Sequence, residues 1–70
     1  MRPDLLGRVQ VRLQVLHAAL SLDDLNLPGW NLHKLHAKPA RWAVAVNGPW
    51  RVTFEWDGKD AHRVDLEQYH

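Results

Sequence analysis

The chain contains no cysteine among its 70 residues. Disulfides and thiolate metal sites are therefore excluded as sources of stability, and the usual marker of an oxidising compartment is missing. No apolar run has the length of a signal-peptide core or the roughly 18 residues of a membrane span. We therefore expect a soluble, cytoplasmic protein without a membrane partner.

Strong charge of one sign is also lacking. Nine Lys and Arg residues stand against eight Asp and Glu residues, which gives a formal net charge of +1. This is far from the cationic balance that by itself indicates a nucleic-acid binder. The length allows one domain at most, which buries only roughly 60% of the surface exposed by its unfolded chain. The four tryptophans help here, because each brings a large apolar surface to a small core.

Apolar residues recur at steps of three and four over the first twenty positions, a pattern typical of an amphipathic helix. The stripe consists of Leu5, Val9, Leu13, Leu16 and Leu20. Arg8 and Arg12 lie off the stripe, and Pro3 suits the first helical turn. Residues 21–24 then combine a serine N-cap with acidic residues, and Pro28-Gly29 ends whatever short helix forms there.

Beyond Gly29 the period changes to two, which predicts strands. The inward positions are Trp42, Val44 and Val46 in the first run, and Trp50, Val52, Phe54 and Trp56 in the second. Asn47-Gly48 and Asp57-Gly58 tolerate the positive φ of tight hairpin turns. A third strand is expected over 61–67, and a short strand over 32–35 is left open. These elements predict an α+β domain in which an N-terminal amphipathic helix packs on a curved antiparallel sheet of three to four strands.

Two finer expectations concern side-chain burial. Val64 and Leu66 should face inward from the third strand, whereas Arg63, Asp65 and Glu67 should face outward. The tryptophans of the strands should belong to the core, and Trp30, which follows Pro28-Gly29, should be the exposed one.

Four short segments follow the helix in a fixed order: Leu32-His33-Lys34-Leu35, Trp42-Ala43-Val44-Ala45-Val46-Asn47, Trp50-Arg51-Val52-Thr53-Phe54 and Tyr69-His70. In this order and spacing they resemble the HigB branch of the RelE-like toxins over nearly the whole chain. Each segment alone is a weak signal, but four of them in register are hard to reach by chance. The resemblance implies a RelE-like fold and a single toxin domain over residues 1–70.

The resemblance also implies a function. Toxins of this family belong to type II toxin–antitoxin systems, enter the ribosomal A site and cut messenger RNA, which arrests translation and growth. We therefore expect an endoribonuclease (an mRNA interferase) that needs no metal or other cofactor. The expected partners are messenger RNA, the ribosome and an antitoxin of the HigA type with a helix-turn-helix domain.

Cleavage of RNA without a metal requires a base for the 2′-hydroxyl proton, an acid for the leaving 5′-oxygen and cations around the phosphate. By the resemblance, His33 and His70 form the acid–base pair, with the direction of proton transfer left open, and Tyr69 stacks on a base or positions the phosphate. Arg51 lies off the core face and is the expected phosphate ligand. Three further residues are expected to contact RNA: His36, Lys38 and Arg41. Lys38 and Arg41 are expected to be cations of the loop between the first two strands.

The chain departs from the family pattern at two places. Family members usually begin with a strand and a short helix, so roughly twenty residues are absent by that comparison. Met1 could then be an internal methionine of a longer product, and an exposed sheet edge would invite a second copy or an antitoxin segment. Gln68 stands where the family has an acidic residue. A catalytically impaired relic that binds its antitoxin or itself is therefore a second hypothesis, and an RNA-binding module that does not cut is a third.

Plainer interpretations stay open for the same residues. His33 is also compatible with an ordinary strand-end histidine, and Tyr69-His70 with a frayed tail or the stub of a tag. Arg51 has acidic neighbours that make it a candidate for surface ion pairs worth under about 1 kcal/mol each. These neighbours are Glu55, Asp65 and Glu67. A zinc site is disfavoured by the lack of thiolates, although the chain offers His33, His36, His62 and His70.

Overall fold

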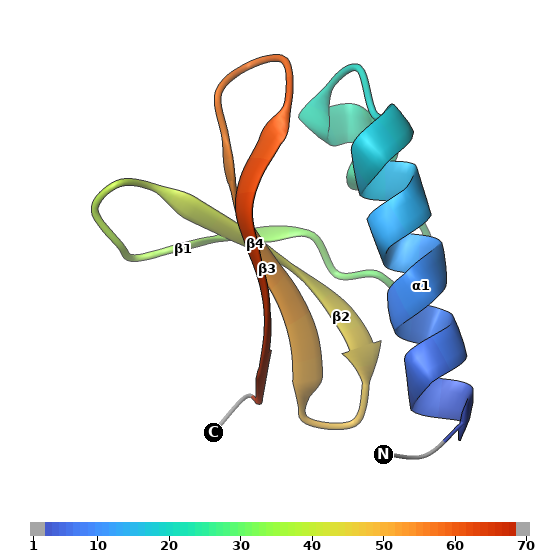
Figure 1. The fold of residues 1–70 in the computed structure, drawn as a ribbon. Coiled ribbons are helices and arrows are strands. Elements are labelled where there is room, and N and C mark those ends of the chain that lie inside the picture. Colours follow the sequence, from blue (N-terminus) through green and yellow to red (C-terminus); the bar gives the residue numbers. More distant parts are fainter. Residues whose placement is uncertain (1–2, 69–70) are drawn as a thin grey trace.

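A helix and a four-stranded sheet form two layers (Figure 1). The computed structural model describes the backbone of residues 3–68 and the side chains of residues 5–68. The elements are α1 (Pro3–Ala18), the 3-10 helix η1 (Leu22–Leu25), β1 (His33–Leu35), β2 (Arg41–Asn47), β3 (Trp50–Trp56) and β4 (Ala61–Gln68). α1 lies along one face of the sheet, and no helix within residues 3–68 covers the other face. The predicted α+β class is confirmed.

The sheet is an antiparallel meander with the strand order β1-β2-β3-β4. Gly48 has φ 56° in the turn between β2 and β3, and Gly58 has φ 94° in the turn between β3 and β4, so both turns use the backbone freedom of glycine. The short strand before the meander is present, with His33 opposite Ala43. Within residues 3–68, no helix is both long enough and apolar enough to cross a membrane.

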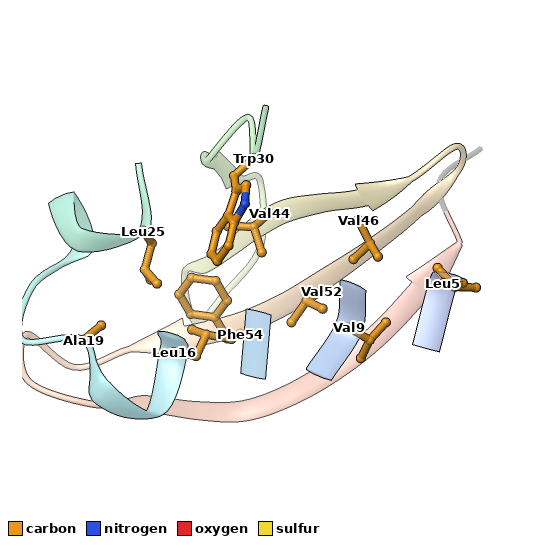
Figure 2. Close-up of a cluster of buried hydrophobic side chains, with 10 residues drawn as sticks. All are labelled: Leu5, Val9, Leu16, Ala19, Leu25, Trp30, Val44, Val46, Val52 and Phe54. Carbon is orange, nitrogen blue, oxygen red and sulfur yellow. The ribbon is translucent and has the colours of Figure 1, made fainter. Parts of the chain in front are cut away.

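The core lies between α1 and the sheet (Figure 2). Its members are Leu5, Val9, Leu16, Ala19, Leu25, Trp30, Val44, Val46, Val52 and Phe54. Phe54 and Val44 have no exposed surface, and Leu25 of η1 closes the end of the cluster near Ala19. The alternation of apolar residues along β2 and β3 directs their side chains to the helix side of the sheet, as the period of two predicts.

The helical stripe differs from the prediction. Leu13 and Leu20 are 42% and 84% exposed, whereas Arg12 is only 8% exposed. The buried positions run 5, 9, 12, 16 and 19, so the buried face of α1 is centred about one position away from the face that leucines alone suggest. Arg12 can occupy this face because its Nε donates a hydrogen bond to the Ala45 carbonyl oxygen at 2.9 Å.

The expectation that Trp30 is exposed is wrong, because its exposed fraction is 8%. Its N–H donates to the Leu27 carbonyl at 3.0 Å, and its own carbonyl accepts the N–H of Ala45 at 2.6 Å. These bonds turn the chain after Gly29 inward, so the indole packs in the core. The three strand tryptophans are half-buried and pack against the cluster; they are Trp42, Trp50 and Trp56.

β4 departs from regular pairing. The register with β3 shifts between Thr53 and Glu55, and Arg63 has φ 50°, so β4 contains an irregular extra residue. Val64 is 43% exposed instead of buried, while Leu66 is half-buried and packs against the core. Hollows of about 230 and 190 Å³ separate Leu13 of α1 from Val64. The groove between α1 and β4 is therefore partly open.

Candidate functional site

A pocket of about 310 Å³ lies beside the turn between β2 and β3. Its lining residues are Asn31, His33, Ala45, Gly48, Pro49, Trp50 and Arg51. His33 of β1 and Arg51 of β3 flank β2, and two strand spacings put β1 and β3 roughly 10 Å apart. Between them β2 presents the small side chains of Ala43 and Ala45 on this face. The pocket therefore brings together two residues that the sequence analysis selected.

His33 is held in one orientation by the backbone. Its Nδ1 lies 2.8 Å from the carbonyl oxygen of Asn31. Because a carbonyl oxygen only accepts, Nδ1 carries the proton of this hydrogen bond. Asn31 has φ 50°, a left-handed conformation that asparagine tolerates better than most residues. This arrangement leaves Nε2 of His33 as the nitrogen that can accept or donate a proton in chemistry.

Arg51 lies on the sheet face that α1 does not cover. It is the register partner of Ala45 on β2 and of Glu67 on β4. Its Nη2 lies 4.0 Å from Oε1 of Glu67, and the side chain is 19% exposed. At this distance the two side chains form an ion pair but not a hydrogen bond. A half-buried, planar guanidinium of this kind can bind a phosphate through two parallel N–H groups.

Arg41 is not in the loop between the first two strands but is the first residue of β2. Its Nη2 donates to Oγ1 of Thr53 at 2.9 Å and to the carbonyl oxygen of Arg63 at 3.0 Å. Its Nη1 donates to Oε2 of Glu55 at 3.4 Å. The structure thus places this guanidinium among acceptors of the sheet, outside the lining of the His33 pocket.

His36 and Lys38 lie in the loop between β1 and β2, which projects away from the sheet in Figure 1. Both are exposed. With Lys34 they line a second depression of about 590 Å³, which shares no residue with the His33 pocket. β1 and the loop after it therefore present two lysines and a histidine to solvent at a separate place from the His33 pocket.

Tyr69 and His70 lie outside the described residues. The last described residue, Gln68, is the register partner of Trp50, which lines the pocket. β4 therefore ends beside the turn between β2 and β3, at the lower end of the sheet in Figure 1.

Some site residues were missed by sequence reasoning. Asn31 acts through its backbone carbonyl, for which no side-chain pattern exists. Thr53 is fully buried although it lies on the outward parity of β3, and its Oγ1 donates to Oε2 of Glu67 at 2.5 Å. The signal in the sequence is the alternation of Arg51, Thr53 and Glu55 on one strand face, but alternation alone does not distinguish a buried hydroxyl from a solvent-facing one.

Within residues 3–68, no group of three or more His, Asp or Glu side chains is arranged to hold a metal ion. His62, one of the histidines in the zinc interpretation, instead bonds Oδ2 of Asp57 through Nε2 at 2.6 Å.

Comparison with known proteins gives two matches. Residues 1–70 match the family model of the RelE-like toxin of the type II toxin–antitoxin system HigB. The endoribonuclease HigB of Proteus vulgaris is 33% identical over 64 residues, which are 90% of this chain and 70% of that relative. The family match spans every described residue, including those of the His33 pocket.

Proposed function

The chain belongs to the RelE-like toxins of the type II toxin–antitoxin system HigB, and on this basis we propose that it is an endoribonuclease that cuts messenger RNA on translating ribosomes in the cytoplasm. The observation that carries the proposal is the single pocket lined by both His33 and Arg51. A proton-transfer group and a phosphate ligand on one concave surface are what RNA cleavage requires.

The proposed reaction is attack of a ribose 2′-hydroxyl on the adjacent phosphorus. A base removes the hydroxyl proton, an acid protonates the leaving 5′-oxygen, and the products are a 2′,3′-cyclic phosphate and a 5′-hydroxyl end. His33 and His70 are the base and the acid, and either histidine can take either role. Nε2 is the reacting nitrogen of His33. Arg51 neutralises the charge that builds on the phosphate, and Tyr69 stacks on a base or positions the phosphate.

We further propose that His36 and Lys38 contact the RNA backbone from their exposed loop, where an attraction to phosphate weakens as salt rises. Arg41 adds positive charge on the sheet face that α1 does not cover, where we propose that RNA binds. Since its guanidinium already donates to three acceptors, we expect its contribution to binding to be smaller than that of Lys38.

Induced expression in bacteria tests the function. The parent chain should arrest growth, and the mapped ends of messages should lie inside translated regions. His33→Ala and His70→Ala should each abolish both effects while remaining soluble. His17→Ala, which removes an exposed histidine on α1, is the matched control and should remain toxic. Growth arrest by His33→Ala at the parent's level would contradict the enzyme.

A type II toxin has an antitoxin partner, and we propose one of the HigA type with a helix-turn-helix domain. The half-open groove between α1 and β4 favours a second candidate function, binding of an antitoxin segment without cleavage. Val64→Asp should then weaken co-purification with the antitoxin, whereas His33→Ala should not. A homodimer through the sheet edge would also be weakened by Val64→Asp. Sedimentation of the chain alone distinguishes the two cases, because only a homodimer forms without the antitoxin.

A further inference from the structure

A hydrogen-bonded network crosses the open face of the sheet from β2 to β4. Arg41 Nη2 donates to Thr53 Oγ1 at 2.9 Å, and the same hydroxyl donates its proton to Glu67 Oε2 at 2.5 Å. A hydroxyl has one proton, so these two bonds fix its direction: it accepts from the guanidinium and donates to the carboxylate. Thr53, the middle residue of the network, has no exposed surface, so packing holds its side chain in this position.

The network reaches Arg51. One oxygen of Glu67 is fixed by Thr53, and the other, Oε1, lies 4.0 Å from Nη2 of Arg51. The two residues are also direct register partners on β3 and β4. An exposed ion pair between two long side chains contributes little because both must lose rotamer freedom. Here the carboxylate has already been ordered by a buried hydroxyl, so Glu67 presents a fixed negative charge to the guanidinium.

This arrangement matters because of where Arg51 stands. Arg51 lines the same pocket as His33. A separation of 4.0 Å orients the guanidinium by charge attraction without the short, parallel bonds of a bidentate pair. Glu67 can therefore hold Arg51 in place without replacing a phosphate as its partner.

We propose that Glu67 is a positioning residue for RNA cleavage, fixed by Thr53 and Arg41 so that its carboxylate sets the guanidinium of Arg51 toward the His33 pocket. This inference rests on the proposed function, since it assigns the support of a group that would contact the phosphate. Arg41 acts through this network, from the far end, in addition to any contact with RNA. A catalytic group displaced by about 1 Å can lose roughly 100-fold in rate, which sets the scale of the effect.

Cleavage kinetics on programmed ribosomes test the proposal. Glu67→Gln keeps the shape and an acceptor for Thr53 but removes the charge, and Thr53→Val removes the hydroxyl at equal size. Each should lower kcat about 10- to 100-fold with KM nearly unchanged. Asp65→Asn removes a neighbouring exposed carboxylate of β4 and should leave kcat as in the parent. Equal losses in Glu67→Gln and Asp65→Asn would overturn the proposal.

A double-mutant cycle separates positioning from general stability. In an Arg51→Lys background, Glu67→Gln should cause little further loss, because its effect passes through the guanidinium. If the losses of Arg51→Lys and Glu67→Gln instead multiply in the double variant, Glu67 acts elsewhere and the proposal is overturned.

A second measurement does not depend on activity. The side-chain ¹⁵N NMR signal of Arg51 in the RNA-free chain should shift and broaden in Glu67→Gln and stay unchanged in Asp65→Asn. An unchanged Arg51 signal in Glu67→Gln overturns the positioning role. If the parent fails to cut RNA while the NMR shift appears, the proposed function fails, and the contact between the two side chains stands.

Discussion

The guanidinium of Arg12 lies over the ring of Trp30, with its central carbon 4.7 Å from the ring centroid. Nε of Arg12 donates to the Ala45 carbonyl, and the Ala45 N–H donates to the Trp30 carbonyl. These contacts tie α1 and the segment before β1 to the middle of β2. Ala45 and Asn31, the residue after Trp30, both line the His33 pocket. The helix therefore anchors the wall of the candidate site through a charged side chain.

Replacement of Arg12 by alanine should strongly destabilise the chain. The change removes a charge-assisted hydrogen bond to Ala45, worth about 1.5–3 kcal/mol, and takes the Arg12 donor away from a partly buried carbonyl. Packing against Trp30 is lost as well. We expect urea unfolding to show a loss of about 3 kcal/mol. Arg12→Met, which keeps an unbranched apolar side chain over the ring, should lose less.

Arg8→Ala is the control for this prediction. Burial lowers the pKa of Arg12, and the neighbouring charge of Arg8 lowers it further, so removal of the Arg8 side chain relieves repulsion. Its backbone carbonyl, which accepts from Arg12 Nη1 at 3.3 Å, is retained. A stability loss in Arg8→Ala as large as that in Arg12→Ala would contradict the assigned contacts.

Two glycines should respond oppositely to alanine. Gly7 lies in α1, and a Cβ there would meet nothing within 4 Å, so Gly7→Ala should raise the free energy of unfolding by about 0.5–1 kcal/mol. Gly58 has equal space but φ 94°, so Gly58→Ala should lower it by about 1 kcal/mol or more. Thermal melting of the two variants beside the parent decides this, and shifts of the same sign would be inconsistent with the backbone described.

Two leucines that follow α1 should differ in their importance. Leu25 has no exposed surface, so Leu25→Ala should cost about 2–5 kcal/mol through lost burial and a cavity. Leu20 is 84% exposed, and Leu20→Ser should change stability by less than about 0.5 kcal/mol. Denaturant unfolding of both variants provides the comparison. A large loss in Leu20→Ser would restore the leucine stripe as the buried face.

The turn between β3 and β4 should make stability depend on pH. The hydrogen bond to Asp57 raises the pKa of His62, while the backbone N–H of Asp60, together with His62, lowers the pKa of Asp57. Because the His62 pKa is raised on folding, its contribution is complete below the ordinary value of 6.5 and is lost as pH rises through the folded pKa. The carboxylate's contribution is instead lost in acid, below its ordinary value of 3.8.

The free energy of unfolding of the parent should therefore fall relative to that of His62→Gln as the pH rises above 6.5 and through the raised pKa of His62. Both side chains are exposed, so we expect a small difference. His17→Gln, on α1, is the control and should follow the parent. Parallel pH profiles for parent and His62→Gln would rule out the coupling to Asp57.

Sequence periodicity predicted the architecture well because the face of the sheet that packs on α1 takes apolar side chains from every second position of β2 and β3. It failed where the deciding interaction is not periodic. Arg12 is buried because a carbonyl thirty-three residues away accepts its hydrogen bond. Trp30 is buried because backbone hydrogen bonds turn the chain inward. No local pattern contains such contacts.

The candidate site was likewise predictable only in part. The family resemblance selected His33, strand alternation selected Arg51, and the sheet order brings them to one pocket. The support of that pocket was invisible in the sequence, because it consists of a backbone carbonyl at Asn31 and a hydroxyl at Thr53. Both depend on strand register, which hairpin turns and one irregularity in β4 determine.

The rate of message cleavage on translating ribosomes by the purified chain and its His33→Gln variant tests the central claim most directly. Glutamine keeps a polar side chain of similar size but cannot transfer the proton. The account predicts a rate at least about 100-fold lower for His33→Gln, with an unchanged melting temperature. Cleavage by His33→Gln at the parent's rate would contradict it.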